Sequence, residues 1–154
     1  MRTAATFGLK SDTYATAAAL AAAGLTVGMV VQDPNTGHER MLVKNTTGTL
    51  AANAALKFVT PASYVVGPVT ASGDYTIGAN DLVGSTVTDS YYFWMTTKGF
   101  MTVLLATSIN AGVIVASNGT SGTLGTVVET ALDQRNIVSC ASSGSGGATL
   151  CYKD

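Results

Sequence analysis

From Leu25 onward the chain is a succession of short runs rich in Val, Ile, Leu, Thr and aromatic residues, each ended by Gly, Asn, Asp or Ser. Runs of this length and spacing are typical of strands joined by tight turns in a sandwich or barrel. The 154 residues are enough to bury a core as one domain without a metal or a disulfide framework. We therefore predict a mainly β fold, either a β-barrel or a β-sandwich.

Turn residues set the limits of the predicted strands. In Asp33–Gly37, Pro34 presets φ and Gly37 ends the turn, so the flanking runs are expected to form a hairpin. The predicted strands are Val27–Val31, Glu39–Lys44, Ala54–Thr60, Tyr64–Val69, Tyr91–Thr97, Phe100–Ala106, Gly112–Ala116, Thr123–Val128, Asn136–Ala141 and Ala148–Tyr152.

The strongest β signal is the pair of runs Tyr91–Thr97 and Phe100–Ala106. Lys98-Gly99 lies between them and predicts a tight hairpin turn, with Gly99 at the position that needs positive φ. Both runs carry apolar residues on each face, which indicates a pair covered on both sides. We expect the aromatic residues of this hairpin to lie in the core or in an interface: Tyr91, Tyr92, Phe93 and Trp94.

The first residues differ from the rest in texture. Residues 1–11 show no clear period and predict an extended arm, whereas Asp12–Ala23 is rich in Ala and predicts one short helix. Ser11 or Asp12 is the expected cap, and Gly24 the expected stop. The predicted domains are thus an arm and helix (1–24) and a β domain (25–154). Similar small-residue turns are compatible with two similar β units within it, about 25–70 and 90–154, and convergent turn chemistry explains the similarity about as well.

Charge is scarce, at 11% of residues, with a net charge of −1. Nucleic-acid binding needs a Lys/Arg footprint, and no basic run is present, so we expect no nucleic-acid partner. The uncharged stretch Thr13–Gln32 is carried by Ala and interrupted by Gly24 and Gly28, so we expect no membrane segment or signal peptide. With so few charges, parts of the surface are expected to pack against other chains.

Groups suited to catalysis are few. The single histidine, His38, precedes Glu39 in a predicted strand, where neighbours point to opposite faces and cannot readily share a metal or a proton. No zinc-ligand spacing occurs. Three aspartates in turns, Asp74, Asp81 and Asp89, match no calcium loop and are expected to be solvated turn residues. We therefore expect no enzyme activity, no catalytic or metal-binding residues and no cofactor.

Two cysteines, Cys140 and Cys151, flank the Gly/Ser-rich loop Ser142–Gly147. A hairpin that brings them together would allow a disulfide, which stabilises a loop of this length by about 3 kcal/mol in the chain-entropy model. In a reducing cytoplasm they would start as two buried thiols. A possible disulfide between them is the favoured prediction for the mature protein.

The segment Tyr92–Leu104 resembles a pattern of small tailed-bacteriophage head proteins, in which an aromatic strand is followed by Thr-Lys-Gly and a second strand. The order continues with the Ala-Gly turn and strand of Asn110–Thr120 and then the Gly-containing run Gly122–Val127. Glu39–Asn45 and Gly48–Leu50 resemble the opening β unit of the same proteins. The resemblance covers about two thirds of the chain. The cysteine pair at the end departs from it.

The resemblance implies a capsid decoration (cement) protein, commonly trimeric, on the outer surface of the virion. Its partner would be the major capsid protein, and it would stabilise the shell by bridging neighbouring coat subunits after synthesis in the host cytoplasm. An extended arm suits strand addition to a coat subunit. The residues expected to make capsid or inter-subunit contacts are Arg2, Thr3, Phe7, Leu9, Lys10 and Tyr14.

Two further classes of binding or structural protein stay open. A carbohydrate- or receptor-binding β module would use Trp94 and the nearby tyrosines as its platform, and burial of Trp94 would argue against it. A pilin-like fibre subunit would also combine an Ala-rich start, a β body and a cysteine pair, but residues 1–12 contain no processing site followed by a long apolar helix.

Overall fold

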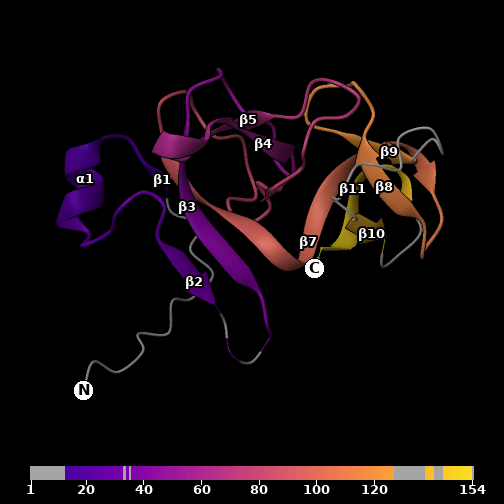
Figure 1. Ribbon diagram of the computed structural model, residues 1–154, viewed down its shortest axis with the longest axis horizontal. Coiled ribbons are helices and arrows are strands. Elements are labelled where there is room, and N and C mark those ends of the chain that lie inside the picture. Colours follow the sequence, from indigo (N-terminus) through magenta and orange to yellow (C-terminus); the bar gives the residue numbers. More distant parts are fainter. Residues whose placement is uncertain (1–12, 33, 35, 127–137, 141–143, 154) are drawn as a thin grey trace.

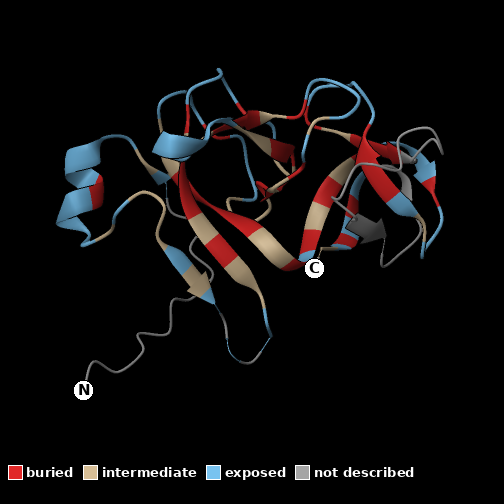
Figure 2. Cartoon of the chain, viewed as in Figure 1, coloured by how far each residue is buried: buried red, intermediate tan, exposed pale blue. Residues whose placement is uncertain are grey.

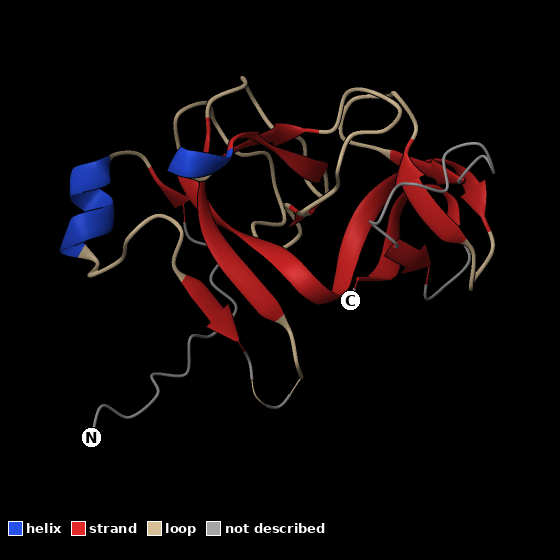
Figure 3. Ribbon diagram, in the orientation of Figure 1, coloured by secondary structure: helices blue, strands red, loops and turns tan. Residues whose placement is uncertain are grey.

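The computed structural model describes residues 13–32, 34, 36–126, 138–140 and 144–153 (Figure 1). It is built almost entirely from strands and the turns between them (Figure 3). The elements in chain order are β1 (Thr13–Tyr14), α1 (Ala17–Ala22), β2 (Val30–Gln32), β3 (Glu39–Asn45), β4 (Ala55–Thr60), the 3-10 turn η1 (Pro61–Ser63), β5 (Val65–Pro68), β6 (Gly78–Ala79), β7 (Tyr92–Ile109), β8 (Ile114–Ser117), β9 (Leu124–Thr126), β10 (Val138–Cys140) and β11 (Gly144–Lys153).

Strand pairing closes two rings that share β7. In the first ring the order is β7-β6-β4-β5-β3, and β3 pairs back with β7. In the second the order is β7-β9-β8-β10-β11, and β11 pairs back with β7. A single residue pair closes β6 onto β7 and another closes β9 onto β7. Because these two seams are so short, neither ring is a regular barrel.

Strand β7 passes from one ring to the other (Figure 1), and its pairing partner changes at Gly99. Residues before it pair with β3, from Tyr92↔Lys44 to Lys98↔Glu39. Residues from Gly99 onward pair with β11. Gly99 has φ 95°, and His38 lies so close that a Cβ at this position would overlap its imidazole. Glycine therefore serves both the backbone angle and the close packing here.

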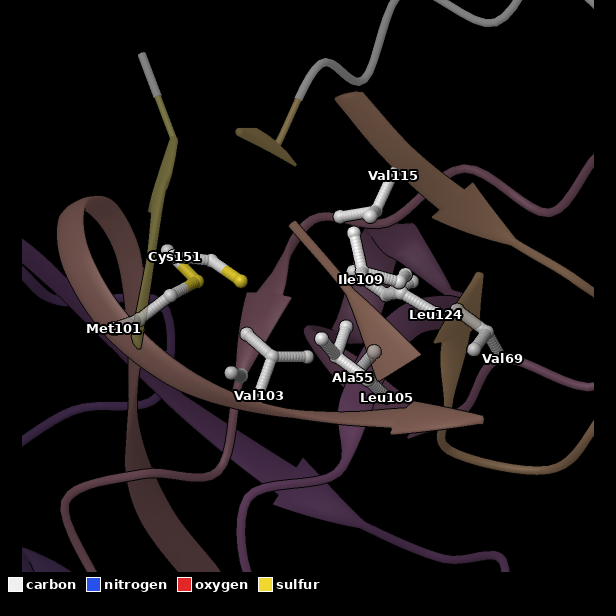
Figure 4. Packing of buried hydrophobic residues seen from close by; sticks show 10 residues of the cluster. Ala55, Val69, Met101, Val103, Leu105, Ile109, Val115, Leu124 and Cys151 are labelled. Atoms are coloured by element: carbon white, nitrogen blue, oxygen red, sulfur yellow. The ribbon is translucent and has the colours of Figure 1, made fainter. Parts of the chain in front are cut away.

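The inward side chains of β7 build both cores. Successive residues of a strand alternate between faces, and Figure 2 shows buried and less buried segments following one another along β7. Phe93 and Met95 pack in the first ring. Met101, Val103 and Leu105 pack in the second ring with residues from β8, β9 and β11, as Figure 4 shows. One strand thus supplies the inner face of two hydrophobic cores.

A third apolar cluster lies outside the first ring, where Trp94 and Leu42 are covered by Leu20 of the helix. Thr16 caps this helix, its hydroxyl accepting the N–H of Ala19 at 3.0 Å. The predicted caps Ser11 and Asp12 lie outside the described residues, and the helix starts later than predicted because Thr13 and Tyr14 pair with β7 instead.

The helix ends as predicted. Gly24 has φ 71°, and the N–H groups of Gly24 and Leu25 donate to the carbonyls of Ala21 and Leu20. This is the hydrogen-bond pattern of a glycine-terminated helix, in which Leu25 also packs on Leu20. None of the helices in the described part of the chain combines the length and the apolar character that a bilayer crossing requires.

The predicted mainly β class with one short helix is confirmed, although the structure is not one clean barrel or sandwich. The predicted hairpin Tyr91–Ala106 is wrong, since Lys98-Gly99 continues a single strand. Lys98 and Gly99 do not reverse the chain because each half of β7 finds a different pairing partner. The predicted arm lies outside the described residues, and the two similar β units stay a prediction.

We expect Gly99→Ala to destabilise the protein more than Gly112→Ala. Both glycines have positive φ, 95° and 80°, so both variants lose about 1–2 kcal/mol from backbone strain. Only Gly99 faces a neighbour, the His38 ring, whereas a Cβ at Gly112 meets open space. Overpacking adds a further loss of about 1–3 kcal/mol at Gly99. Urea unfolding followed by circular dichroism measures the difference, and equal losses would contradict the role assigned to Gly99.

Candidate interaction surface

The aromatic residues singled out in the sequence separate in the structure. Phe93 is fully buried in the first ring, and Trp94 is 3% exposed in the outer cluster beneath the helix. Tyr91 and Tyr92 are half-buried. An exposed platform for a sugar therefore cannot form on Trp94, which argues against that version of the carbohydrate-binding alternative.

Of the predicted contact residues, Tyr14 is the one within the described ranges. It is half-buried, lies opposite Tyr92 across the β1–β7 pair and packs against the outer cluster. The others, Arg2, Thr3, Phe7, Leu9 and Lys10, lie outside the described residues. Tyr14 thus stands at the point where the preceding segment meets β7.

An exposed apolar patch lies on the outer face of the second ring. Phe100 of β7 stands directly opposite Tyr152 of β11, and their rings meet edge to face at 5.2 Å between centroids. Leu150 lies two residues before Tyr152, on the same face. The exposed fractions of these side chains are 48%, 37% and 43%. We call Phe100, Leu150 and Tyr152 the outer patch.

Two neighbours extend the outer patch. His38 contacts Phe100 edge to face, with ring centroids 6.5 Å apart. Ile114 of β8, 44% exposed, pairs with Ser139, which itself pairs with Tyr152, so Ile114 belongs to the same row across the sheet. An apolar group of this kind on a sheet face is typical of a surface that meets another protein.

Sequence reasoning missed the outer patch, although part of the signal was present. Period-two alternation places Phe100 on the face opposite Met101 and Val103, and Leu150 and Tyr152 on the face opposite Cys151. The pairing of β7 with β11, which joins them into one patch, crosses about fifty positions of sequence and has no local signature. Predicting the patch therefore required knowledge of the register between β7 and β11.

The two cysteines are register partners. Cys140 of β10 stands directly opposite Cys151 of β11. Residues directly opposite on antiparallel strands have Cα separations of about 4.5–5.5 Å, within the range that a disulfide spans. The Cys151 side chain is buried beside Met101 in the second core (Figure 4). The pairing therefore meets the backbone requirement of the predicted disulfide, which itself stays a prediction.

Asp81 departs from the expectation of a solvated turn residue. Its carboxylate accepts the hydroxyl of Thr96 at 2.7 Å and the N–H of Thr102 at 3.3 Å, on either side of the bend in β7. Burial raises the pKa of Asp81, while these hydrogen bonds and the charge of buried Arg40 oppose the rise. Its place between the two rings indicates a structural role in holding the bend.

Asp74 and Asp89 accept backbone hydrogen bonds in turns, Asp74 from its own loop and Asp89 from a turn 41 positions earlier in the chain. Asp89 accepts the N–H of Gly48 at 3.1 Å. Asp74 accepts the N–H groups of Thr70 and Ala71 and forms an ion pair with Lys57 at 2.7 Å. Burial raises the pKa of Asp74, but the hydrogen bonds and the Lys57 charge outweigh it and lower the pKa to about 2.

Within the described residues no three side chains of the metal-binding types come together. His38 contacts an aromatic ring, and the Glu39 carboxylate accepts the hydroxyl of Thr97 at 2.9 Å. The arrangement on the second ring is suited to apolar contact with another macromolecule, because exposed aromatic and aliphatic groups gather there.

No known family model matches the chain, and neither does any curated protein. Among solved structures the chain is similar to the N base of the head fibre gp8.5 of bacteriophage phi29. The TM-score is 0.57 at 10% sequence identity, and the match covers 82% of this chain and 95% of that chain. At this identity the likeness shows a common fold.

We expect the stability contributed by Asp74 to disappear in acid. Its folded pKa of about 2 lies below the ordinary value of 3.8, so the contribution is complete above about pH 4 and is lost as the pH falls toward 2. The difference in unfolding free energy between the wild type and Asp74→Asn, at most about 2 kcal/mol after solvent screening, should therefore shrink over this range. Urea unfolding at pH 5, 4, 3 and 2 measures it, and a constant difference would contradict the assignment.

We also expect oxidised glutathione to convert the two thiols of Cys140 and Cys151 into a disulfide, with two molecules of reduced glutathione released. The oxidised form should be more stable than the reduced form by about 3 kcal/mol. Alkylation in denaturant followed by mass spectrometry measures the state of each cysteine. Cys140→Ser is the control and should lose the dependence on oxidant. Alkylation of both cysteines after oxidation would exclude the disulfide.

Proposed function

We propose that this chain is a non-enzymatic structural protein of a phage virion, where it binds the outer surface of the capsid and bridges neighbouring coat subunits. The observation that carries the proposal is the likeness of fold to the N base of a phage head fibre, which extends over 95% of that chain. The order of motifs along the sequence, which resembles that of small phage head proteins, supports the same proposal.

The outer patch supports the proposal as the surface that meets the coat. Its three side chains are aromatic or aliphatic and exposed on a sheet face, so covering them removes apolar area from water at about 25 cal/mol per Å². Repeated over the many equivalent sites of a shell, and over several copies of the chain, modest contacts of this kind add up through avidity.

The segment before β1 is the second proposed contact. Tyr14 brings the chain to the edge of the first ring, and residues 1–10 would then add contacts with a neighbouring coat subunit or with another copy of this chain. The proposed assembly is a homotrimer on the major capsid protein, reached after synthesis in the host cytoplasm. No nucleic acid or membrane takes part in it.

The test uses heads of the phage that encodes the chain, prepared from a deletion of its gene. We expect the purified protein to bind these heads and Leu150→Ser to reduce occupancy at least tenfold, because it places a hydroxyl in the apolar contact. Val59→Ser is the matched control, since Val59 is similarly exposed, at 49%, on the first ring. Sedimentation of heads with labelled protein measures occupancy, and equal binding by both variants would remove the outer patch from the proposal.

A shortened chain without residues 1–10 tests the second contact in the same assay. It should keep the circular dichroism of the full chain while losing capsid occupancy. Light scattering on the free protein gives the mass of the proposed trimer. If the wild type fails to bind the gene-deleted heads at all, the capsid proposal is wrong as a whole.

A further inference from the structure

A groove on the first ring, remote in the chain from the outer patch, has the make-up of a small-molecule site. It is an open groove with a volume of about 550 Å³, within the range common for ligand pockets. Strand β4 and the start of η1 form one wall, and the loop before β6 forms the other. The lining residues are Lys57, Phe58, Val59, Pro61, Asp74, Tyr75 and Ile77.

The walls of the groove are largely apolar and carry one open aromatic ring. Tyr75 is 57% exposed, the most exposed large hydrophobic residue in the described chain, and Val59 beside it is 49% exposed. A tyrosine side chain that lines a groove and is more than half exposed offers an apolar face and a polar hydroxyl at once. Such a face suits the C–H side of a sugar ring.

The polar part of the groove is a single ion pair. Lys57 Nζ donates to Asp74 Oδ2 at 2.7 Å and to the Thr70 hydroxyl at 2.9 Å. Asp74 Oδ2 also accepts the N–H groups of Thr70 and Ala71, at 2.6 and 2.7 Å. Every hydrogen bond that the Asp74 carboxylate accepts in the described part of the chain thus uses Oδ2. The ion pair remains partly accessible, with side chains 25% and 17% exposed.

The hydrogen-bonding groups that Lys57 and Asp74 leave unused define the kind of ligand that the groove can bind. Lys57 has three donor hydrogens and uses two, while Asp74 Oδ1 keeps acceptor capacity beside it. One donor next to one acceptor matches two adjacent hydroxyl groups. The two charges cancel, and no other charged residue lines the groove in the described chain, so a charged ligand would find no counter-ion there. Charge complementarity therefore favours an uncharged polyol with an apolar face.

We propose that this groove binds a neutral hexopyranose unit of a glycan, with Tyr75 against the C–H face of the ring and the Lys57–Asp74 pair at two adjacent hydroxyl groups. The site is separate from the one proposed for the capsid, because it lies on the first ring and shares no residue with the outer patch. The aromatic residue of this proposed site is Tyr75, and not Trp94 as the carbohydrate-binding alternative expected from the sequence, because Trp94 is buried.

The test is a heteronuclear NMR titration of the intact ¹⁵N-labelled protein with methyl glycosides of glucose, mannose and galactose. We expect at least one of them to shift the amides of Lys57–Val59 and Asp74–Ile77, with a dissociation constant in the millimolar range typical of a single small contact set. Glucuronic acid and glucosamine, which carry charge, should bind at least about tenfold more weakly than the best neutral glycoside.

Two variants separate the site from general effects. Tyr75→Ala should weaken binding at least about tenfold, whereas Tyr152→Ala, an exposed tyrosine of the outer patch, should leave it unchanged. Asp74→Asn, checked for folding by its amide spectrum, should also weaken binding. Absence of shifts with all three glycosides up to about 50 mM, equal shifts with glycerol, or full binding by Tyr75→Ala would each overturn the proposal. Capsid occupancy of Tyr75→Ala, measured separately, should remain that of the wild type.

Discussion

Strand β7 is the element on which the rest of the structure depends, since both rings close on it. Its first half is hydrogen-bonded to β3 and its second half to β11, and its inward side chains enter both cores. Each ring closes on its own half of this strand, so the continuous backbone at Gly99 is what joins the two rings. Asp81 reinforces the junction, because its carboxylate joins Thr96 before the bend to the backbone N–H of Thr102 after it.

Local signals in the sequence predicted the class of the fold and most of its strands. Glu39–Lys44 and Ala54–Thr60 lie within one residue of β3 and β4, because period-two patterns and flanking turn residues act over a few positions. Lys98-Gly99 misled because positive φ at glycine serves a bend as well as a hairpin. The pairing of Phe100 with Tyr152, and the groove between Lys57 and Tyr75, arise from contacts between distant segments that no local pattern encodes.

The scarcity of charge gives each charged side chain in the described structure unusual weight. Arg40 and Asp81 lie at the junction of the rings and are largely buried. A buried charge without a partner destabilises the fold, whereas a buried charge with a partner favours the arrangement that brings the two together. Lys57 and Asp74 fasten the loop of residues 70–75 to β4. Few charged side chains therefore remain to separate the exposed apolar residues of the surface. The outer patch on the second ring is one place where such residues lie together.

The two proposed surfaces belong to different rings, and this separation is what a protein on the outside of a particle would need. If the second ring binds the shell through Phe100, Leu150 and Tyr152 as proposed, the first ring and its groove at Tyr75 would stay free to meet a soluble or cell-bound glycan. Continuous hydrogen bonding through β7 couples the two rings mechanically. The proposed millimolar sugar contact would then gain strength through the number of copies on one particle, because many sites would engage a glycan-covered surface together.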